Sequence, residues 1–190
     1  MNPAFIVDGF TEQLIIQQLC PNRPIRRSIN GKDVSLKRAA AEIVAIIRRL
    51  NNRNYPIIIL TDREERPDSF LTMATELKRE ILEQLPSINK PADIRIGVAD
   101  RMIENWILAD AEALGNAPEI PPETDGLGGK GLMKKIMPTY SETVDGSALF
   151  FKADVSKMYE NSPSFKHFVN QLEDLNCPYL DFDKKEDPSV

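Results

Sequence analysis

The stretch that most constrains the fold is a short apolar run that ends at two carboxylates. Pro56 precedes Ile57–Leu60, and the chain then continues through Thr61 to Asp62 and Glu64. An unbroken apolar run of this length is typical of a parallel strand that is buried on both faces. Ligands of open α/β sheets bind at the carboxyl ends of such strands. We therefore expect Asp62 and Glu64 to lie at a ligand-binding edge, the alternative being a solvated turn with an acidic helix N-terminus.

Two further apolar runs precede helical patterns. Residues 4–7 are followed by Asp8, and a helical repeat begins near Thr11, which we expect to cap that helix. Residues 93–98 form the third expected strand, and a helix is expected over 101–114. Strands that alternate with helices predict an α/β fold with a parallel sheet and right-handed crossovers.

The other helices are predicted from apolar periodicity and capping residues. They are expected from a Ser35 cap to Leu50, from Asp68 or Ser69 to Pro86, from near Lys130, over about 147–160, and from Ser162-Pro163 onward. Residues 26–32 contain an Asn-Gly turn signal. We expect them to form an edge strand or a hairpin outside the main crossovers.

The chain is expected to have three parts. Residues 1–114 carry the α/β core, and residues 115–129, rich in Gly and Pro without an apolar repeat, are expected to form a mobile loop. Residues 130–190 are expected to form a helical extension packed on the core. The predicted fold class is therefore α/β, a parallel sheet flanked by helices with extra C-terminal helices.

Composition is that of an ordinary globular protein. The chain has 190 residues, 42% of them hydrophobic, which is enough for one buried core. No apolar run approaches the ~20 residues of a membrane span, and the first residues lack a signal-peptide pattern, so we expect a cytoplasmic protein with no membrane partner. Cys20 and Cys177 are far apart and belong to no Cys-x-x-Cys pair. We expect them to be small core residues, neither zinc ligands nor a disulfide.

Basic residues are concentrated in one part of the chain. The net charge of -5 argues against binding of nucleic acid by bulk electrostatics alone, yet nine basic and two acidic residues lie between Arg23 and Arg53. This asymmetry predicts a phosphate-facing surface, and the alternative is a helix with a solvated basic face. The residues expected to bind nucleic acid are Arg26, Arg27, Lys32, Lys37, Arg38 and, outside this segment, Lys130.

Acidic residues follow all three expected strands. Asp8 and Glu12 follow the first, Asp62 and Glu64 the second, and Glu104, with Asp100 as a further candidate, the third. Carboxylates that converge on one sheet edge repel one another unless a proton or a cation intervenes. The sequence therefore predicts a site for a divalent cation, for which carboxylates are suitable ligands.

These residues also resemble a known family. Phe5-Ile6-Val7-Asp8-Gly9-Phe10-Thr11-Glu12 resembles the Val-Glu-Gly-x-Thr-Glu opening of topoisomerase-primase (TOPRIM) domains, and Thr61-Asp62-Arg63-Glu64 resembles their Asp-x-Asp motif. Residues 103–110, with the sequence Ile-Glu-Asn-Trp-Ile-Leu-Ala-Asp, resemble a block of a bacterial family of TOPRIM-like proteins of unknown function. In that family a Lys-rich segment and a late Pro-Ser-Phe follow, as residues 130–135 and 163–165 do here.

The resemblance implies phosphodiester chemistry that depends on Mg²⁺ or Mn²⁺. Carried over by position, Asp8 acts as general acid or base, and Asp62 with Glu64 holds the metal, to which Asp8 also contributes. Glu12 and Glu104 complete the expected catalytic set. The chain departs from the family pattern at two places, because Asp8 stands where Glu is usual and Glu64 where Asp is usual. A shift of about 1 Å in a reacting group can cost ~10²-fold in rate, so these departures bear on activity more than on metal binding.

Other catalytic chemistries find little support. Residues 126–131 superficially resemble a phosphate-binding loop, but Gly131 stands where Ser or Thr is required and no strand precedes the segment. His167 is the only histidine, which leaves Ser-His-Asp and Cys-His catalysis to depend on one poorly placed residue.

We therefore expect a metal-dependent nuclease of TOPRIM type that acts in phage defence or DNA processing. DNA is expected as substrate in preference to RNA, with an ATPase as partner protein, since TOPRIM-like proteins often accompany one. The alternative is a non-catalytic partner or nucleic-acid-binding subunit that keeps the fold without cleaving anything.

Overall fold

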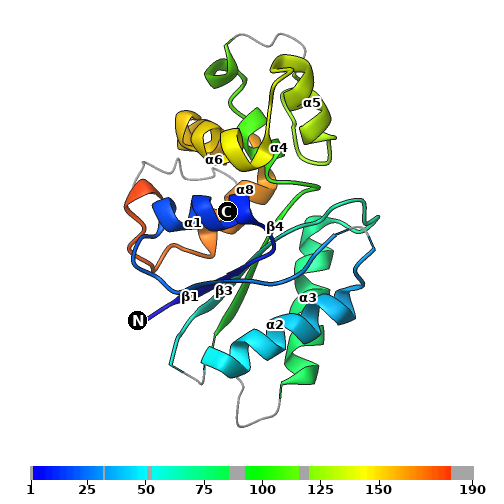
Figure 1. Ribbon diagram of the computed structural model, residues 1–190, viewed down its shortest axis with the longest axis vertical. Helices are drawn as coiled ribbons and strands as arrows, with labels where there is room; N and C mark the ends of the chain where they lie inside the picture. Colours follow the sequence, from blue (N-terminus) through cyan, green and yellow to red (C-terminus); the bar gives the residue numbers. More distant parts are fainter. Residues whose placement is uncertain (1, 32, 51–52, 86–92, 116–119, 181–190) are drawn as a thin grey trace, which may run out of the picture.

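The structure is a computed structural model, and it describes residues 2–31, 33–50, 53–85, 93–115 and 120–180. One sheet lies between two layers of helices (Figure 1). None of the helices in the described ranges is long and apolar enough to cross a membrane.

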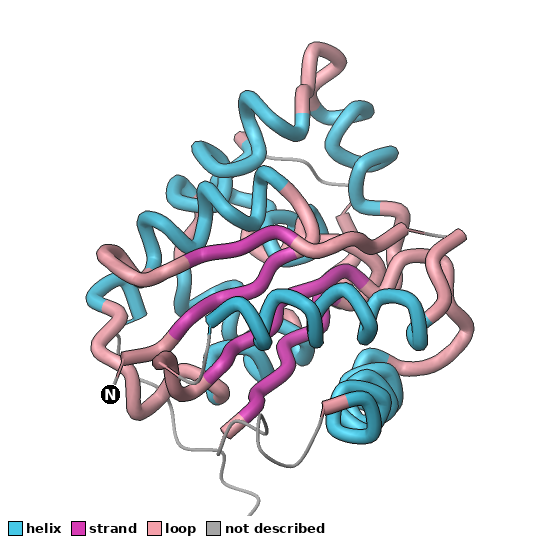
Figure 2. Tube along the Cα trace, turned by 60° about the horizontal axis from the view of Figure 1, so that its bottom comes forward, coloured by secondary structure: helices cyan, strands magenta, loops and turns pink. Residues whose placement is uncertain are grey.

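The sheet has four parallel strands in the order β2-β1-β3-β4. Figure 2 shows them side by side, and their bounds are β1 (Ala4–Val7), β2 (Ile25–Arg27), β3 (Ile57–Asp62) and β4 (Ile94–Ala99). The predicted parallel α/β fold is thus confirmed. In the register, Val7 lies opposite Leu60, and Asp62 lies opposite Ala99. β3 therefore extends two residues beyond β1, which places Asp8 beside the end of β3.

β2 is an edge strand, as one of the two alternatives predicted, but it does not lie outside the crossovers. It pairs in parallel with β1, so the intervening helix is the crossover of a β-α-β unit. A hairpin would require the antiparallel direction. After β2 the chain crosses back over the opposite face of the sheet, through the second helix, to reach β3.

The helices cover both faces of the sheet. Their bounds are α1 (Phe10–Leu19), α2 (Leu36–Leu50), α3 (Phe70–Gln84), α4 (Glu104–Leu108), α5 (Gly129–Ile136), α6 (Glu142–Lys152), α7 (Val155–Asn161) and α8 (Pro163–Asn170), with 3-10 turns η2 (Ala111–Leu114) and η3 (Pro178–Leu180). α2 and α3 pack on one face, whereas α1 and the helices after β4 pack on the other (Figure 1).

Alternate residues of each central strand point into the two helical layers. Ile57 and Ile59 belong to the apolar cluster under α2 and α3, and Ile58 and Leu60 belong to the cluster under the other helices. Each of these four side chains is at most 1% exposed. An unbroken apolar run is what a strand covered on both faces requires.

Several helix boundaries differ from the predictions for local reasons. Thr11 lies inside α1 and does not cap it, and its hydroxyl donates to the carbonyl of Glu142 at 3.1 Å. The helix expected over 101–114 is shorter, because Arg101 has a left-handed φ of 79°. The helix expected over about 147–160 is two helices, since the side chain of Asp154 accepts from the Ser156 amide and begins α7. The predicted Ser69 and Ser162 caps are confirmed.

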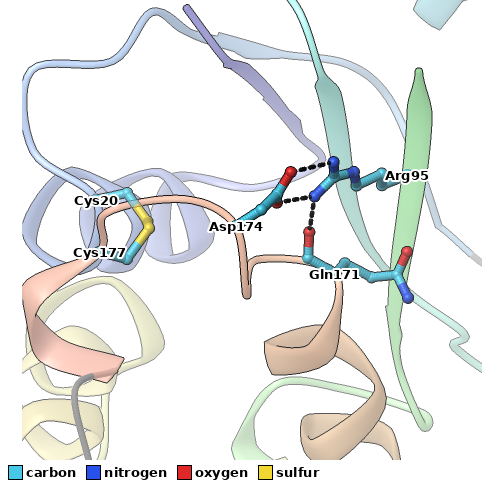
Figure 3. Close-up of a disulfide and its surroundings, with 5 residues drawn as sticks. All are labelled: Cys20, Arg95, Gln171, Asp174 and Cys177. Carbon is cyan, nitrogen blue, oxygen red and sulfur yellow. Dashed lines mark hydrogen bonds and ion pairs between the residues drawn. A yellow bond between two sulfur atoms is a disulfide. The ribbon is translucent and has the colours of Figure 1, made fainter. Parts of the chain in front are cut away.

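The two cysteines form a disulfide, which corrects the prediction that they are unpaired core residues (Figure 3). Cys20 ends α1, and Cys177 immediately precedes η3, with 4.6 Å between their Cα atoms. The pairing joins positions 157 residues apart in the chain, so no local spacing could reveal it. Near this bond in Figure 3, Arg95 on β4 forms an ion pair with Asp174 and donates to the carbonyl of Gln171 at 2.7 Å. The end of the described chain is therefore attached to both α1 and the sheet.

Candidate functional site

The carboxyl ends of β1 and β3 are joined through the side chain of Asp8. Its Oδ2 accepts hydrogen bonds from Thr61 Oγ1 at 2.7 Å, from the Asp62 amide at 2.9 Å and from Asn30 Nδ2 at 2.8 Å. Asn30 also donates to the carbonyl of Asp62 at 2.7 Å. These bonds fix one carboxylate oxygen of Asp8 between the strands, and the second oxygen takes no part in them.

Asp62 is the last residue of β3 and lies beside Asp8 at this edge. Its carboxylate is buried, and Oδ1 has no hydrogen-bond partner among the described residues. Burial raises the pKa of Asp62 well above its ordinary value, and the negative charges of Asp8 and Glu12 raise it further. A buried carboxylate oxygen without a partner requires a proton or a cation.

Glu12 lies in the first turn of α1 and folds back over the turn that follows β1. A Cβ added at Gly9 would lie 2.0 Å from Oε2 of Glu12, so only glycine leaves room for this carboxylate. Glu12 is 3% exposed. Burial, followed by the charge of Asp8, raises its pKa to about 8. Glu12 is therefore largely protonated at neutral pH.

Glu104, the first residue of α4, contributes the acid that follows β4. Its side chain is fully buried, Oε1 accepts from the Tyr140 hydroxyl at 3.1 Å, and Oε2 has no partner among the described residues. Burial raises the pKa of Glu104, and the positive charge of Lys130 partly opposes this effect. Asp100, which also follows β4, is instead paired with Arg63.

Glu64 is less buried than the other acids and lies in the loop after β3 with a left-handed φ of 60°. Burial raises its pKa, while the charges of Lys130 and Arg66 lower it. Arg66 holds this loop against the one that carries Asn30, because its Nη2 donates to Asn30 Oδ1 at 2.8 Å and to the Val34 carbonyl at 2.8 Å.

The predicted catalytic and metal residues thus lie in one electrostatically coupled group, which we call the acidic edge. It consists of Asp8, Glu12, Asp62, Glu64 and Glu104. In the part of the chain that the structure describes, no three acidic, His or Cys side chains are already grouped to hold one ion. The unpartnered oxygens of Asp62 and Glu104 and the raised pKa values fit a hard cation, because carboxylate oxygens are the ligands that Mg²⁺ binds.

Lys130 differs from the other predicted nucleic-acid-binding residues because it belongs to the surroundings of the acidic edge. It lies at the start of α5 beside Gly129, where an added Cβ would lie 2.2 Å from Asn105 Oδ1, so glycine permits close packing on α4. Lys130 Nζ is 2.8 Å from Glu142 Oε2. Burial lowers its pKa, but the bond to Glu142 and the charge of Glu104 outweigh burial and raise it.

The remaining predicted basic residues lie away from the acidic edge. Arg26 and Arg27 are exposed on β2, and Lys37 and Arg38 are exposed in the first turn of α2. Lys32 lies outside the described residues. The guanidinium of Arg27 lies 5.9 Å from the centre of the Phe10 ring. A role of these side chains in binding nucleic acid stays a prediction.

Four residues of the site were not found from the sequence. Asn30 belongs to the pair interpreted as a hairpin turn, and Arg66 follows the acidic loop without a recognisable motif. Tyr140 and Glu142 lie far along the chain, and no local pattern connects them with the sheet edge. The mobility predicted for 115–129 stays a prediction, although in its described part Thr124 donates to the Asn105 carbonyl at 2.7 Å.

The chain matches the model of a protein family. The model of a domain of unknown function, DUF4276, matches residues 7–173. No curated protein and no solved structure matches the chain. The matched region includes all of the acidic edge and extends beyond the end of α8. Because the match spans most of its length, the chain belongs to the DUF4276 family.

Proposed function

We propose that this chain is a nuclease of TOPRIM type that hydrolyses phosphodiester bonds with Mg²⁺ or Mn²⁺. The observation that carries the proposal is the buried, unpartnered Oδ1 of Asp62 within a group of acids from three strand ends. Burying several carboxylates close together destabilises the folded chain, and such groups with raised pKa values are typical of catalytic sites. The resemblance of the segments around Asp8, Asp62 and Glu104 to TOPRIM motifs supports the same activity.

Asp62 and Glu64 would hold the cation, beside the carboxylate of Asp8. When bound, the ion offsets the negative charge of the phosphate and assists deprotonation of the attacking water. Asn30 donates to Asp8 and to the carbonyl of Asp62, and Arg66 donates to Asn30, so both are positioning residues.

Two acids of the edge are suited to proton transfer. The new bond forms between the water oxygen and phosphorus as the bond from phosphorus to the leaving oxygen breaks. The second oxygen of Asp8 accepts the proton from water, and Glu12, whose pKa is about 8, donates its proton to the leaving oxygen. Glu104 is fully buried and holds Tyr140, so it acts on the geometry of the site.

The charge of the chain limits how strongly it can hold a nucleic acid by itself. The basic residues of β2 and α2 are exposed and few, and the net charge is -5, so the isolated chain should hold nucleic acid weakly at physiological salt. We propose DNA as the substrate and an ATPase as the partner that presents it, with a role in phage defence or DNA processing.

One observation favours a second candidate function, that of a non-catalytic partner subunit. The described residues hold no preformed group of three ligands for an ion. Asp8 and Glu64 also replace the Glu and Asp that are usual in TOPRIM motifs. A chain that keeps the fold but not the activity would contribute a surface to a larger assembly.

A cleavage assay separates the two candidates. Single- and double-stranded DNA and RNA are incubated with Mg²⁺ or Mn²⁺, with and without the product of an adjacent ATPase gene. The double variant Asp62→Asn, Glu64→Gln should lose more than about 100-fold in rate. The control, Glu42→Gln on the exposed face of α2, should cleave normally. If the double variant cleaves as fast as the wild type in every arm, the nuclease proposal is wrong.

A further inference from the structure

A cavity of about 340 Å³ is lined by residues of α5 and of the start of α6. Figure 1 shows these two helices on the same side of the sheet as α4. We call this space the α5–α6 cavity. It is lined by Lys130, Lys134, Tyr140, Ser141, Glu142 and Thr143. Every lining residue carries a polar group, and two of them are lysines one helical turn apart on α5. Its volume lies at the lower end of the range of ligand sites, about 300–1,000 Å³.

Two residues that line the cavity also interact with the acidic edge. Tyr140 donates to Glu104 at 3.1 Å, and the charge of Lys130 acts on Glu104, Glu64 and Asp62. A ligand in this cavity would therefore lie next to the phosphodiester that the acidic edge is proposed to cleave. Two other cavities, around Cys177 and around Asp110, are lined by different residues.

The charges of the cavity indicate what it binds. Lys130 is already neutralised by Glu142 at 2.8 Å. Lys134 is exposed and makes no ion pair with any residue that the structure describes. At the start of α6 the Ser141 amide already donates to Asp145 Oδ2 at 2.7 Å, and the first turn carries the carboxylates of Glu142 and Asp145, so the positive charge available to a second anion is that of Lys134. A second anion is thus favoured near Lys134, and it would compete with Glu142 for Lys130.

We propose that the α5–α6 cavity binds a backbone phosphate of the nucleic acid adjacent to the phosphate at the acidic edge. Lys134 contacts this phosphate, and the carboxylate of Glu142 occupies its place beside Lys130 until substrate binds. This inference rests on the proposed function and adds the path of the strand, which runs from the acidic edge between α5 and α6.

The test measures binding apart from cleavage. A fluorescein-labelled single-stranded DNA of ~20 nucleotides is titrated with the full chain in EDTA at several salt concentrations, and affinity is read by anisotropy. Lys134→Gln should reduce the salt slope by about 0.7, the value for one phosphate contact on a single strand, which corresponds to about fivefold weaker binding at 0.1 M salt. Lys135→Gln is the matched control, because Lys135 is the exposed neighbour on α5 that does not line the cavity.

Glu142→Gln should change the affinity for DNA in the opposite direction to Lys134→Gln. Removal of the competing carboxylate frees Lys130, so binding should tighten by about threefold, with a steeper salt slope. Equal affinities of the Lys134→Gln and Lys135→Gln proteins, weaker binding by Glu142→Gln, or no binding by the wild type would each overturn the subsite. Cleavage by the wild type is scored separately in Mg²⁺, with and without the product of the adjacent ATPase gene. Cleavage without a Lys134 effect would reject the subsite alone, and a Lys134 effect without cleavage would reject only the nuclease.

Discussion

Replacement of Glu12 by glutamine should change the pH dependence of folding in a predictable direction. The folded-state pKa of Glu12 is raised to about 8 from 4.5, chiefly by burial. Between these pH values the folded chain keeps a proton that the unfolded chain has released. Unfolding then releases protons, so the stability is complete below about pH 4.5 and is lost as the pH rises toward 8. Glutamine has a similar shape and does not titrate, so the Glu12→Gln variant lacks this loss.

The magnitude follows from the two pKa values. The loss of stability linked to Glu12 amounts to about 1 kcal/mol at pH 5 and about 4 kcal/mol at pH 8. Relative to wild type, Glu12→Gln should therefore gain on the order of 3 kcal/mol between the two pH values. A comparison across pH cancels any constant effect of the substitution on packing. Asp8, Asp62, Glu64 and Glu104 also have raised pKa values and act in the same direction, and they remain in both proteins.

Urea unfolding at pH 5, 6, 7 and 8 in EDTA provides the measurement. The free energies of unfolding of wild type, Glu12→Gln and the exposed control Glu42→Gln are compared at each pH. The two lines for wild type and Glu42→Gln should be parallel, and the line for Glu12→Gln should fall less steeply. Parallel lines for all three proteins would refute the claim that Glu12 is held protonated by its buried position.

Three further predictions concern other parts of the chain. Mg²⁺ at ten times its Kd should stabilise the wild type by about 1.4 kcal/mol, and Asp62→Ala should abolish the gain; an equal gain in both proteins would remove this metal site. Cys177→Ser removes a disulfide that joins positions 157 residues apart and should lower the free energy of unfolding by up to about 5 kcal/mol relative to the oxidised wild type. Reduction of the wild type should lower its free energy of unfolding by as much. Gly9→Ala should displace the carboxylate of Glu12 from its buried position. The free energy of unfolding of this variant should therefore fall less between pH 5 and 8 than that of the wild type, and an unchanged pH dependence would contradict the packing described.

The fold was predictable where local pattern and burial agree. The apolar run at 57–60 indicated a strand covered on both faces, and Ser69 and Ser162 begin helices as their capping side chains indicate. The direction of β2 was not predictable, because three residues and an Asn-Gly pair fit either an edge strand or a hairpin. The break between α6 and α7 was missed, because the apolar repeat continues across it. The side chain of Asp154 caps α7 through a contact with the nearby Ser156 amide.

The acidic edge was predictable only in its strand-end residues. The carboxyl ends of parallel strands lie at the same edge of a sheet. The order of strands and helices in the sequence was therefore enough to predict that the acids after β1, β3 and β4 lie close together. Their partners could not be predicted, because the contacts join distant positions. Tyr140 reaches Glu104 across 36 residues, and Asn30 reaches Asp8 across 22. The disulfide was missed for the same reason, since pairing over such distances depends on the packed structure.

The helices after residue 129 are part of the site, because the buried acids depend on them. Glu104 has one described hydrogen-bond partner, Tyr140, and the positive charge that lowers its pKa belongs to Lys130. Both residues come from the C-terminal extension, and the same layer packs on β4 through Phe168, which lies where a Cβ on Gly97 would stand. In the folded chain this hydrogen bond and this charge offset part of the cost of burying the Glu104 carboxylate, which is several kcal/mol for a group without compensation. The hydrogen bond and the pKa of Glu104 within the acidic edge therefore depend on the helices that follow residue 129.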